Sequence, residues 1–114
     1  MITTSEKANA QQRAADMMRD VGIQIRNDEI SRIEVVDFGL SQLEGEGVQV
    51  LTMVSTARLA AKVLVLFPNQ TEPEHWHPQV GEDPGKQETI RHIGGDLRFY
   101  VEGQDNMTEG FLVD

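Results

Sequence analysis

The chain has 114 residues, a formal net charge of -9 at pH 7 and no cysteine, a size that fits one domain with one core. Clustered Lys and Arg are lacking, which argues against a nucleic-acid surface. No apolar run approaches the roughly 20 residues that cross a bilayer. Without cysteine, a metal would be held by His and carboxylate groups. The N-terminus lacks the basic start and apolar core of a secretory signal, which predicts a cytoplasmic protein.

A capping-box spacing marks the start of a helix near the N-terminus, because Thr3 lies three residues before Glu6. Apolar residues then recur at helical spacing and form one stripe on a polar helix: Ala10, Ala14, Met17, Met18 and Val21. Gly22 is expected to end the helix. Such a stripe indicates packing rather than chemistry, so we expect it to cover a sheet or a partner subunit.

A second, shorter helix is expected from Asp28 to near residues 37–39, with Ile30 and Ile33 facing inward. The two helices define a predicted N-terminal helical segment, residues 1–44. Nothing in this segment indicates catalysis.

From residue 45 the pattern changes to short runs of β-branched and apolar residues, which predict strands. These runs are 48–54, 61–67, a segment around residue 75, 88–93, 97–101 and the beginning of another at 111–113. Turns are expected at Pro68-Asn69 and Gly94-Gly95, and a loop over residues 80–86.

The predicted fold is mainly β, an antiparallel barrel or sandwich over residues 45–114 that carries the N-terminal helical segment. The segment has room for about five or six short strands. A closed small barrel has about eight, so an incomplete barrel is the alternative.

Two of the three histidines, His75 and His77, lie one residue apart on a predicted strand. Side chains at i and i+2 of a strand point to the same face about 7 Å apart, so both imidazoles can close on one metal ion. An isolated H-x-H is often only a partly exposed strand. Glu88, eleven residues after His77, arrives from the next predicted strand, completes a set of three donors and favours a metal site.

The third histidine, His92, lies about 13 Å along a regular strand from Glu88. That distance is too long for a shared metal, so we interpret His92 as a structural or surface residue.

The spacing of His75, His77, Glu88 and Gly95 resembles the first motif of the cupin superfamily. Asn69 stands where that motif has a glycine, and asparagine can adopt the same left-handed turn. The gap between His77 and Glu88 is longer than the usual few residues.

Several stretches are similar to one family of cupins, the D-lyxose isomerases. They are DFGL at 37–40, KVLVLFP at 62–68, PEHWHP at 73–78, GKQETIR at 85–91 and YVEG at 100–103. The likeness spans most of residues 28–103, and the combined pattern is much more specific than H-x-H alone. It implies a cupin-like antiparallel β-barrel.

This resemblance implies a metal-dependent aldose–ketose isomerase that converts D-lyxose to D-xylulose, and also D-mannose to D-fructose, by proton transfer through a metal-stabilised enediolate. It implies a divalent metal, manganese first, with His75, His77 and Glu88 as ligands. The family takes a fourth ligand, a histidine, from a second motif. No histidine follows His92, so we expect this chain to carry the first motif only.

The general base has no assignment, and Lys62 and Lys86 are candidates only for contacting sugar hydroxyls or a developing oxyanion. Lys62 stands in an apolar strand, where a charge is costly unless it faces a polar cavity or an exposed surface. Lys86 lies in the predicted loop, where a solvated surface position is as compatible with the sequence as a contact with the sugar.

Two other functions stay open: a non-catalytic cupin module that binds metal or sugar, and an iron-dependent cupin dioxygenase with the same donor set. The loop at 84–86 favours the isomerase over the dioxygenase. The expected partner is a small sugar, with neither nucleic acid nor membrane. The apolar helix stripe and an open barrel edge predict a homodimer.

Overall fold

The structure is a computed structural model that describes residues 1–73 and 89–99. The chain divides into two units, Met1–His75 and Trp76–Asp114, and each is described by itself. Among the described helices, none has both the length and the apolar character that a bilayer span requires.

The first unit begins with helix α1, Thr4–Asp20, which starts where the sequence predicts. The Thr3 hydroxyl accepts a hydrogen bond from the backbone N–H of Glu6 at 3.1 Å, and the Glu6 carboxylate accepts one from the backbone N–H of Thr3 at 3.3 Å. Both ends of the predicted capping box are therefore present. Gly22 follows the helix with φ +90°, a left-handed conformation that glycine adopts at little cost.

The predicted apolar stripe of α1 is confirmed for most of its length. Ala10, Ala14 and Met18 are buried, and Met17 packs against the core from a partly buried position. Val21 is the exception, because it caps the C-terminus of the helix and is 46% exposed. The helical spacing fails there because the helical backbone ends one residue earlier.

The prediction of a second helix reaching residues 37–39 is wrong in its extent. Helix α2 is a single turn, Asn27–Ile30, and strand β1, Glu34–Val36, follows it. Ile33 is buried as predicted, but it lies between the two elements rather than on a helix face. The β-branched residues after it adopt extended backbone, because an adjacent strand pairs with them.

A three-stranded antiparallel sheet forms the rest of this unit, in the order β1–β2–β3. Strand β2 is Val48–Ser55 and strand β3 is Ala60–Val65, close to the runs predicted at 48–54 and 61–67. Pairs such as Val35 with Gln49 and Leu51 with Val63 fix the register.

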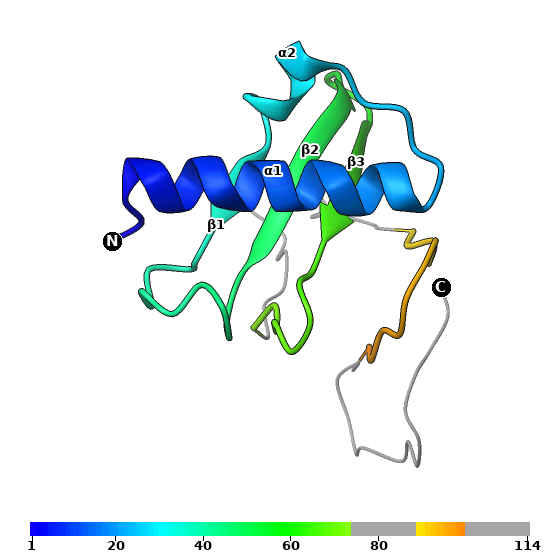
Figure 1. The fold of residues 1–114 in the computed structure, drawn as a ribbon. Helices are drawn as coiled ribbons and strands as arrows, with labels where there is room; N and C mark the ends of the chain where they lie inside the picture. Colours follow the sequence, from blue (N-terminus) through cyan, green and yellow to red (C-terminus); the bar gives the residue numbers. More distant parts are fainter. Residues whose placement is uncertain (74–88, 100–114) are drawn as a thin grey trace. The chain divides into compact units, whose positions relative to one another are not determined.

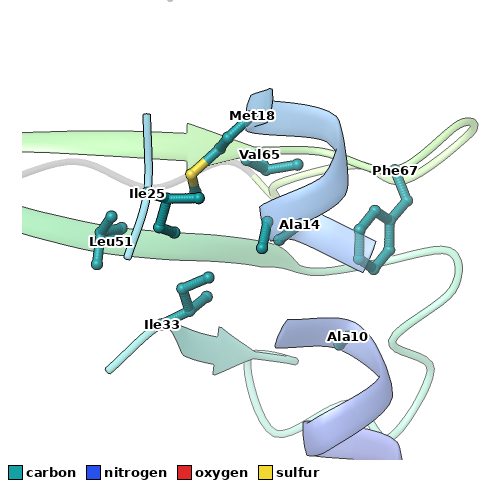
Figure 2. Packing of buried hydrophobic residues seen from close by; sticks show 9 residues of the cluster. Ala10, Ala14, Met18, Ile25, Ile33, Leu51, Val65 and Phe67 are labelled. Carbon is teal, nitrogen blue, oxygen red and sulfur yellow. The ribbon is translucent and has the colours of Figure 1, made fainter. Parts of the chain in front are cut away.

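Helix α1 lies across one face of the sheet (Figure 1). Small alanines on its inner face allow the helix backbone to approach the strands, while larger side chains fill the space beside them. Figure 2 shows how the core residues come together from the helix, the following loop and the strands: Ala10, Ala14, Met18, Ile25, Ile33, Leu51, Val65 and Phe67. Residues on both sides of the predicted division at 44/45 thus share one core, and the division itself stays a prediction.

The predicted class, an antiparallel sheet that carries an N-terminal helix, is confirmed. Over the described residues the sheet is open, because β1 and β3 each pair along one edge only. This is consistent with an incomplete barrel. The helix stripe predicted to cover a sheet or a partner subunit covers this sheet.

The second unit is described over residues 89–99, which form no strand. The strands predicted at 88–93 and 97–101 are therefore wrong over 89–93 and 97–99. Alternating apolar residues give a segment the capacity for strand, but a strand also needs a neighbour to take its backbone hydrogen bonds. A bend is present at Gly94-Gly95, where Gly95 has φ +79°.

Candidate functional site

The predicted metal ligands His75, His77 and Glu88, and the loop residue Lys86, lie outside the described residues. Within residues 1–73 and 89–99, no three His, Asp or Glu side chains gather closely enough to hold a metal ion. The assignment of the ligands stays a prediction from the sequence. The structure does describe the chain that leads to them, from the end of β3 to Pro73.

A turn follows β3, and it precedes the predicted ligands in the sequence. Asn69 has φ +65°. It therefore adopts the left-handed conformation that was predicted for it because it stands where the cupin motif has a glycine. The backbone N–H of Gln70 donates to the carbonyl oxygen of Phe67 at 2.9 Å and closes this turn.

Immediately after the turn, the chain is bound to the loop that precedes β2. The backbone N–H of Gly47 donates to the carbonyl oxygen of Thr71 at 2.9 Å, and the N–H of Thr71 donates to the carbonyl oxygen of Gly45 at 2.8 Å. These two bonds form a parallel bridge between Glu46 and Thr71. Thr71 stands four residues before His75.

Two buried amide side chains join the same segments from within. Gln49 is 0% exposed and Gln70 is 7% exposed. The Nε2 of Gln49 donates to the Oε1 of Gln70 at 2.9 Å and to the carbonyl oxygen of Val65 at 2.9 Å. The Nε2 of Gln70 donates to the carbonyl oxygen of Leu43 at 2.6 Å and to the Oε1 of Gln49 at 3.2 Å.

The Oε1 of Gln70 also accepts a hydrogen bond from the backbone N–H of Phe67 at 3.0 Å. Backbone partners fix the orientation of both amides, because a carbonyl oxygen requires the NH₂ end and a backbone N–H requires the oxygen end. We refer to Gln49 and Gln70 as the amide pair.

Gly47 allows the amide pair and β1 to come this close. A Cβ atom at this position would lie 2.6 Å from the carbonyl oxygen of Val36 and 3.0 Å from the Nε2 of Gln70. Both distances are shorter than a normal contact, so a larger residue would push these groups apart.

Neither Gln49 nor Gln70 is among the functional residues predicted from the sequence. The sequence signal for the amide pair is Gln49, which lies two positions before Leu51 and therefore on the same inward face of a predicted strand. A polar residue at an inward position needs a buried hydrogen-bond partner. The identity of that partner, 21 residues away, depends on the tertiary structure.

Lys62, the one sequence-predicted candidate that the structure describes, lies on β3 opposite Thr52 of β2. Its neighbour Val63 packs against the core beneath α1, so Lys62 faces away from α1. The side chain is exposed and makes no ion pair with the described residues. Its charge therefore has no burial cost in this unit, and its contact with a sugar stays a prediction.

An open groove of about 720 Å³ lies between the first half of α1 and residues 41–45. Arg13 is the cation at its wall, and it is already engaged: its Nη1 lies 2.8 Å from the Oε1 of Glu44, and its guanidinium carbon lies 3.9 Å from the centre of the Phe67 ring. No histidine lines the groove, and its lining residues share no position with the predicted donors His75, His77 and Glu88.

His92, interpreted from the sequence as structural or surface, is partly buried. Its Nε2 is buried and has no hydrogen-bond partner among the described residues.

Comparison with known proteins finds no family model that matches the chain. Among curated proteins, it is 48% identical over 100 residues to a D-lyxose ketol-isomerase of Cohnella laeviribosi, which covers 88% of this chain and 55% of that protein. It is 46% identical over 104 residues to a D-lyxose/D-mannose isomerase of Thermosediminibacter oceani, covering 91% and 58%. It is 42% identical over 103 residues to a D-lyxose ketol-isomerase of a Thermofilum species, covering 90% and 57%.

The chain thus spans a little over half the length of the curated relatives it matches. The matches cover about nine-tenths of the chain, and D-lyxose stands in the names of all three relatives. Over the length that it shares with them, the similarity supports a relationship to the D-lyxose isomerase family.

Proposed function

We propose that the protein carrying this chain is a metal-dependent aldose–ketose isomerase that interconverts D-lyxose and D-xylulose. The observation that carries the proposal is the 42–48% identity to three curated proteins, two named D-lyxose ketol-isomerase and one D-lyxose/D-mannose isomerase. D-mannose is the second substrate to be tested, because the Thermosediminibacter protein is named for both sugars.

The proposal includes a cupin-like barrel and a divalent metal, manganese first, held by His75, His77 and Glu88. The donor set fits such an ion, because two imidazoles and one carboxylate suit manganese, iron, zinc or nickel. When bound, the metal would polarise the carbonyl group of the open-chain sugar. Among the described residues, the backbone of Thr71, four residues before His75, is hydrogen-bonded to the loop at 45–47.

The reaction moves one proton from C2 to C1 and another between the two oxygens, so that no external oxidant is needed. A base must lie within hydrogen-bond reach of both carbons, and we assign it to no residue of this chain. Lys62 is an exposed ammonium on the face of the sheet away from α1, and we propose that it donates hydrogen bonds to sugar oxygens. Lys86 is the alternative donor.

The experiment is an anaerobic incubation of the metal-free protein, reloaded with Mn²⁺, with D-lyxose and with D-mannose. Formation of D-xylulose or D-fructose, measured by chromatography, is the expected result. An oxygenase would give no ketose without oxygen. A sample that retains Mn²⁺ and binds the sugar but makes no ketose would refute the isomerase and leave a binding module.

The metal claim has its own test, elemental analysis of the wild type beside His77→Ala and His92→Ala. We expect the His77 variant to lose bound metal and the His92 variant to retain it. Equal metal content in the wild type and the His77 variant would remove His77 from the ligand set.

We also propose a homodimer. Of the two features that predicted it, the helix stripe is buried against the sheet, so the open sheet edge is the support for the proposal. The support is the sheet itself, because β1 and β3 each leave one edge unpaired within the described residues, and such edges favour pairing with another chain. Light scattering on the purified protein tests this, and a monomer mass would refute it.

A further inference from the structure

We infer that a polar patch on β2 and β3, formed by Thr52, Ser55 and Lys62, binds hydroxyl groups of the sugar substrate. The inference rests on the proposed function, because the contact of Lys62 with sugar oxygens is proposed there. It adds two hydroxyl groups to that contact and explains their position by an irregularity in the pairing of β2 with β3. We refer to these three residues as the polar patch.

Thr52 lies on the same face of the sheet as Lys62. The two residues are direct partners across β2 and β3, and directly opposed side chains of an antiparallel pair share a face, with Cβ atoms about 5 Å apart. Lys62 faces away from α1, because its neighbour Val63 packs against the core on the α1 side. Thr52 therefore presents its hydroxyl group on the face away from α1.

The register between the two strands shifts by one residue just after Thr52. The next pairs are Val54 with Ala61 and Ser55 with Ala60. A regular ladder would place Val54 opposite Ala60 instead. One extra residue in β2, a β-bulge, thus turns Val54 to the other face and brings Ser55 into its place.

The bulge places Ser55 on the face of Lys62. The partner of Ser55, Ala60, lies two positions before Lys62 on β3, and side chains at i and i+2 of a strand point to one face. Diagonal neighbours across an antiparallel pair lie about 7–8 Å apart. Bulges occur beside active sites, where they re-aim side chains. Here the bulge replaces an apolar neighbour of the ammonium group with a hydroxyl group.

The polar groups of the patch are available to a ligand. The side chains of Ser55 and Lys62 are exposed and that of Thr52 is partly exposed, and none of the three side chains makes a hydrogen bond or ion pair with the described residues. By contrast, the hydroxyl group of Thr56 is hydrogen-bonded within the turn that joins the two strands. An ammonium group donates, and hydroxyl groups both donate and accept, so the patch matches the donors and acceptors of neighbouring sugar hydroxyl groups.

The row of residues beside the polar patch favours a neutral, partly apolar ligand. Val50 pairs with Leu64, whose side chain is 48% exposed, and Glu34 of β1 is the other partner of Val50. Within the described strands, this face therefore carries one cation, Lys62, and one carboxylate, Glu34. The balanced charge suits a neutral polyol better than an anion. The apolar pair offers contact to its C–H groups, in the usual combination of apolar and polar groups in ligand sites.

The bulge gives the sharpest variant for a test. Deletion of Met53 shortens β2 by the extra residue and should return Val54 to the place of Ser55. Met53→Ala is the matched control, because it changes the same position and keeps the register. We expect the deletion to raise KM for D-lyxose by about three- to tenfold, the value of one hydrogen bond, and the alanine control to leave KM unchanged.

The single substitutions test each polar group. We expect Ser55→Val and Thr52→Val each to raise KM by about three- to tenfold, and Lys62→Met to raise it by about tenfold or more, since a charged donor makes stronger hydrogen bonds. Lys7→Met, at an exposed position of α1, is the control for the loss of a lysine. A contact made equally in the ground state and the transition state changes KM and leaves kcat unaltered.

Binding is also measured without turnover. The probe is the alditol of D-lyxose, which has no carbonyl group and cannot be isomerised, and its dissociation constant is measured by NMR titration of each variant beside the wild type. The same fold-changes are expected as for KM. Circular dichroism shows which variants are folded, and if the deletion variant is not, Ser55→Val and Thr52→Val carry the test.

The outcomes separate this inference from the proposed function. Raised KM and weaker alditol binding in the patch variants, with both controls unchanged, support the polar patch. Wild-type KM and binding in folded Ser55→Val and Thr52→Val would overturn it and leave the isomerase intact. A wild type that binds the alditol through these residues and makes no ketose would refute the isomerase and support the patch. A wild type that neither binds the alditol nor makes ketose would overturn both.

Discussion

Met18 connects α1 to the core, and its truncation gives a quantitative test of the packing. Its side chain is 1% exposed, and it reaches from the helix toward Ile25 (Figure 2). Met18→Ala removes three buried heavy atoms, a transfer loss of about 2.4 kcal/mol at roughly 0.8 kcal/mol per buried group. The cavity left behind adds to this loss, so we expect a decrease of about 3 kcal/mol in the free energy of unfolding, within the 2–5 kcal/mol typical of such changes.

The matched control is Met17→Ala, one position earlier in the same helix. The change in helix propensity is the same for both substitutions, so it cancels in the comparison. Met17 is only partly buried, and we expect its substitution to cost about 1 kcal/mol or less. Urea denaturation followed by circular dichroism measures both values. Equal losses in the two variants would refute the packing of α1 described above, because they would mean that Met18 is no more buried than its neighbour.

Three further predictions concern local features of the first unit. Thr3→Ala removes the hydroxyl that caps α1 and should lower the free energy of unfolding by about 1 kcal/mol in urea denaturation; an unchanged midpoint would contradict the cap. Gly47→Ala should destabilise the protein strongly, because the added Cβ would lie 2.6 Å from a β1 carbonyl oxygen. Gly45→Ala is the control, because its Cβ meets no atom closer than 3.8 Å and the substitution should be tolerated. Similar melting temperatures for the two variants would contradict this geometry. The hydrogen bond from Arg26 holds the pKa of Asp28 below its ordinary value of 3.8, so its contribution to stability is present above that pH and is lost as the pH falls through the lower folded-state value. Asp28→Asn should therefore be slightly less stable than the wild type at pH 7 in low salt and equal to it in strong acid; a difference that persists in acid would exclude the ion pair as its cause.

The sequence motif and the curated relatives bear on different parts of the proposed function. The motif nominates donors that can hold a divalent cation, and the three relatives are named as isomerases of D-lyxose. The described structure adds a hydrogen-bonded turn that ends a few residues before the predicted donors in the sequence.

Local signals in the sequence determined those parts of the protein whose conformation depends on neighbouring residues. Thr3 and Glu6 set the start of α1, Gly22 follows its end, and Asn69 adopts a left-handed turn, because caps and turns are made by side chains and backbone within a few positions. The long strand β2 was also predictable, since eight residues of strand-forming character carry a clear pattern.

Tertiary structure alone decided the features that depend on distant partners. Strand β1 has three residues, too few to show a period, and it exists because Glu34–Val36 pairs with β2. The reverse holds at 89–93, where an apolar pattern is present and no strand forms. The amide pair joins Gln49 to Gln70 across 21 positions, and a contact at that separation is set by the register of the sheet and by the close approach at Gly47. The sequence alone thus nominates the donors His75, His77 and Glu88, whereas the fold decides how the chain that leads to the first of them is held.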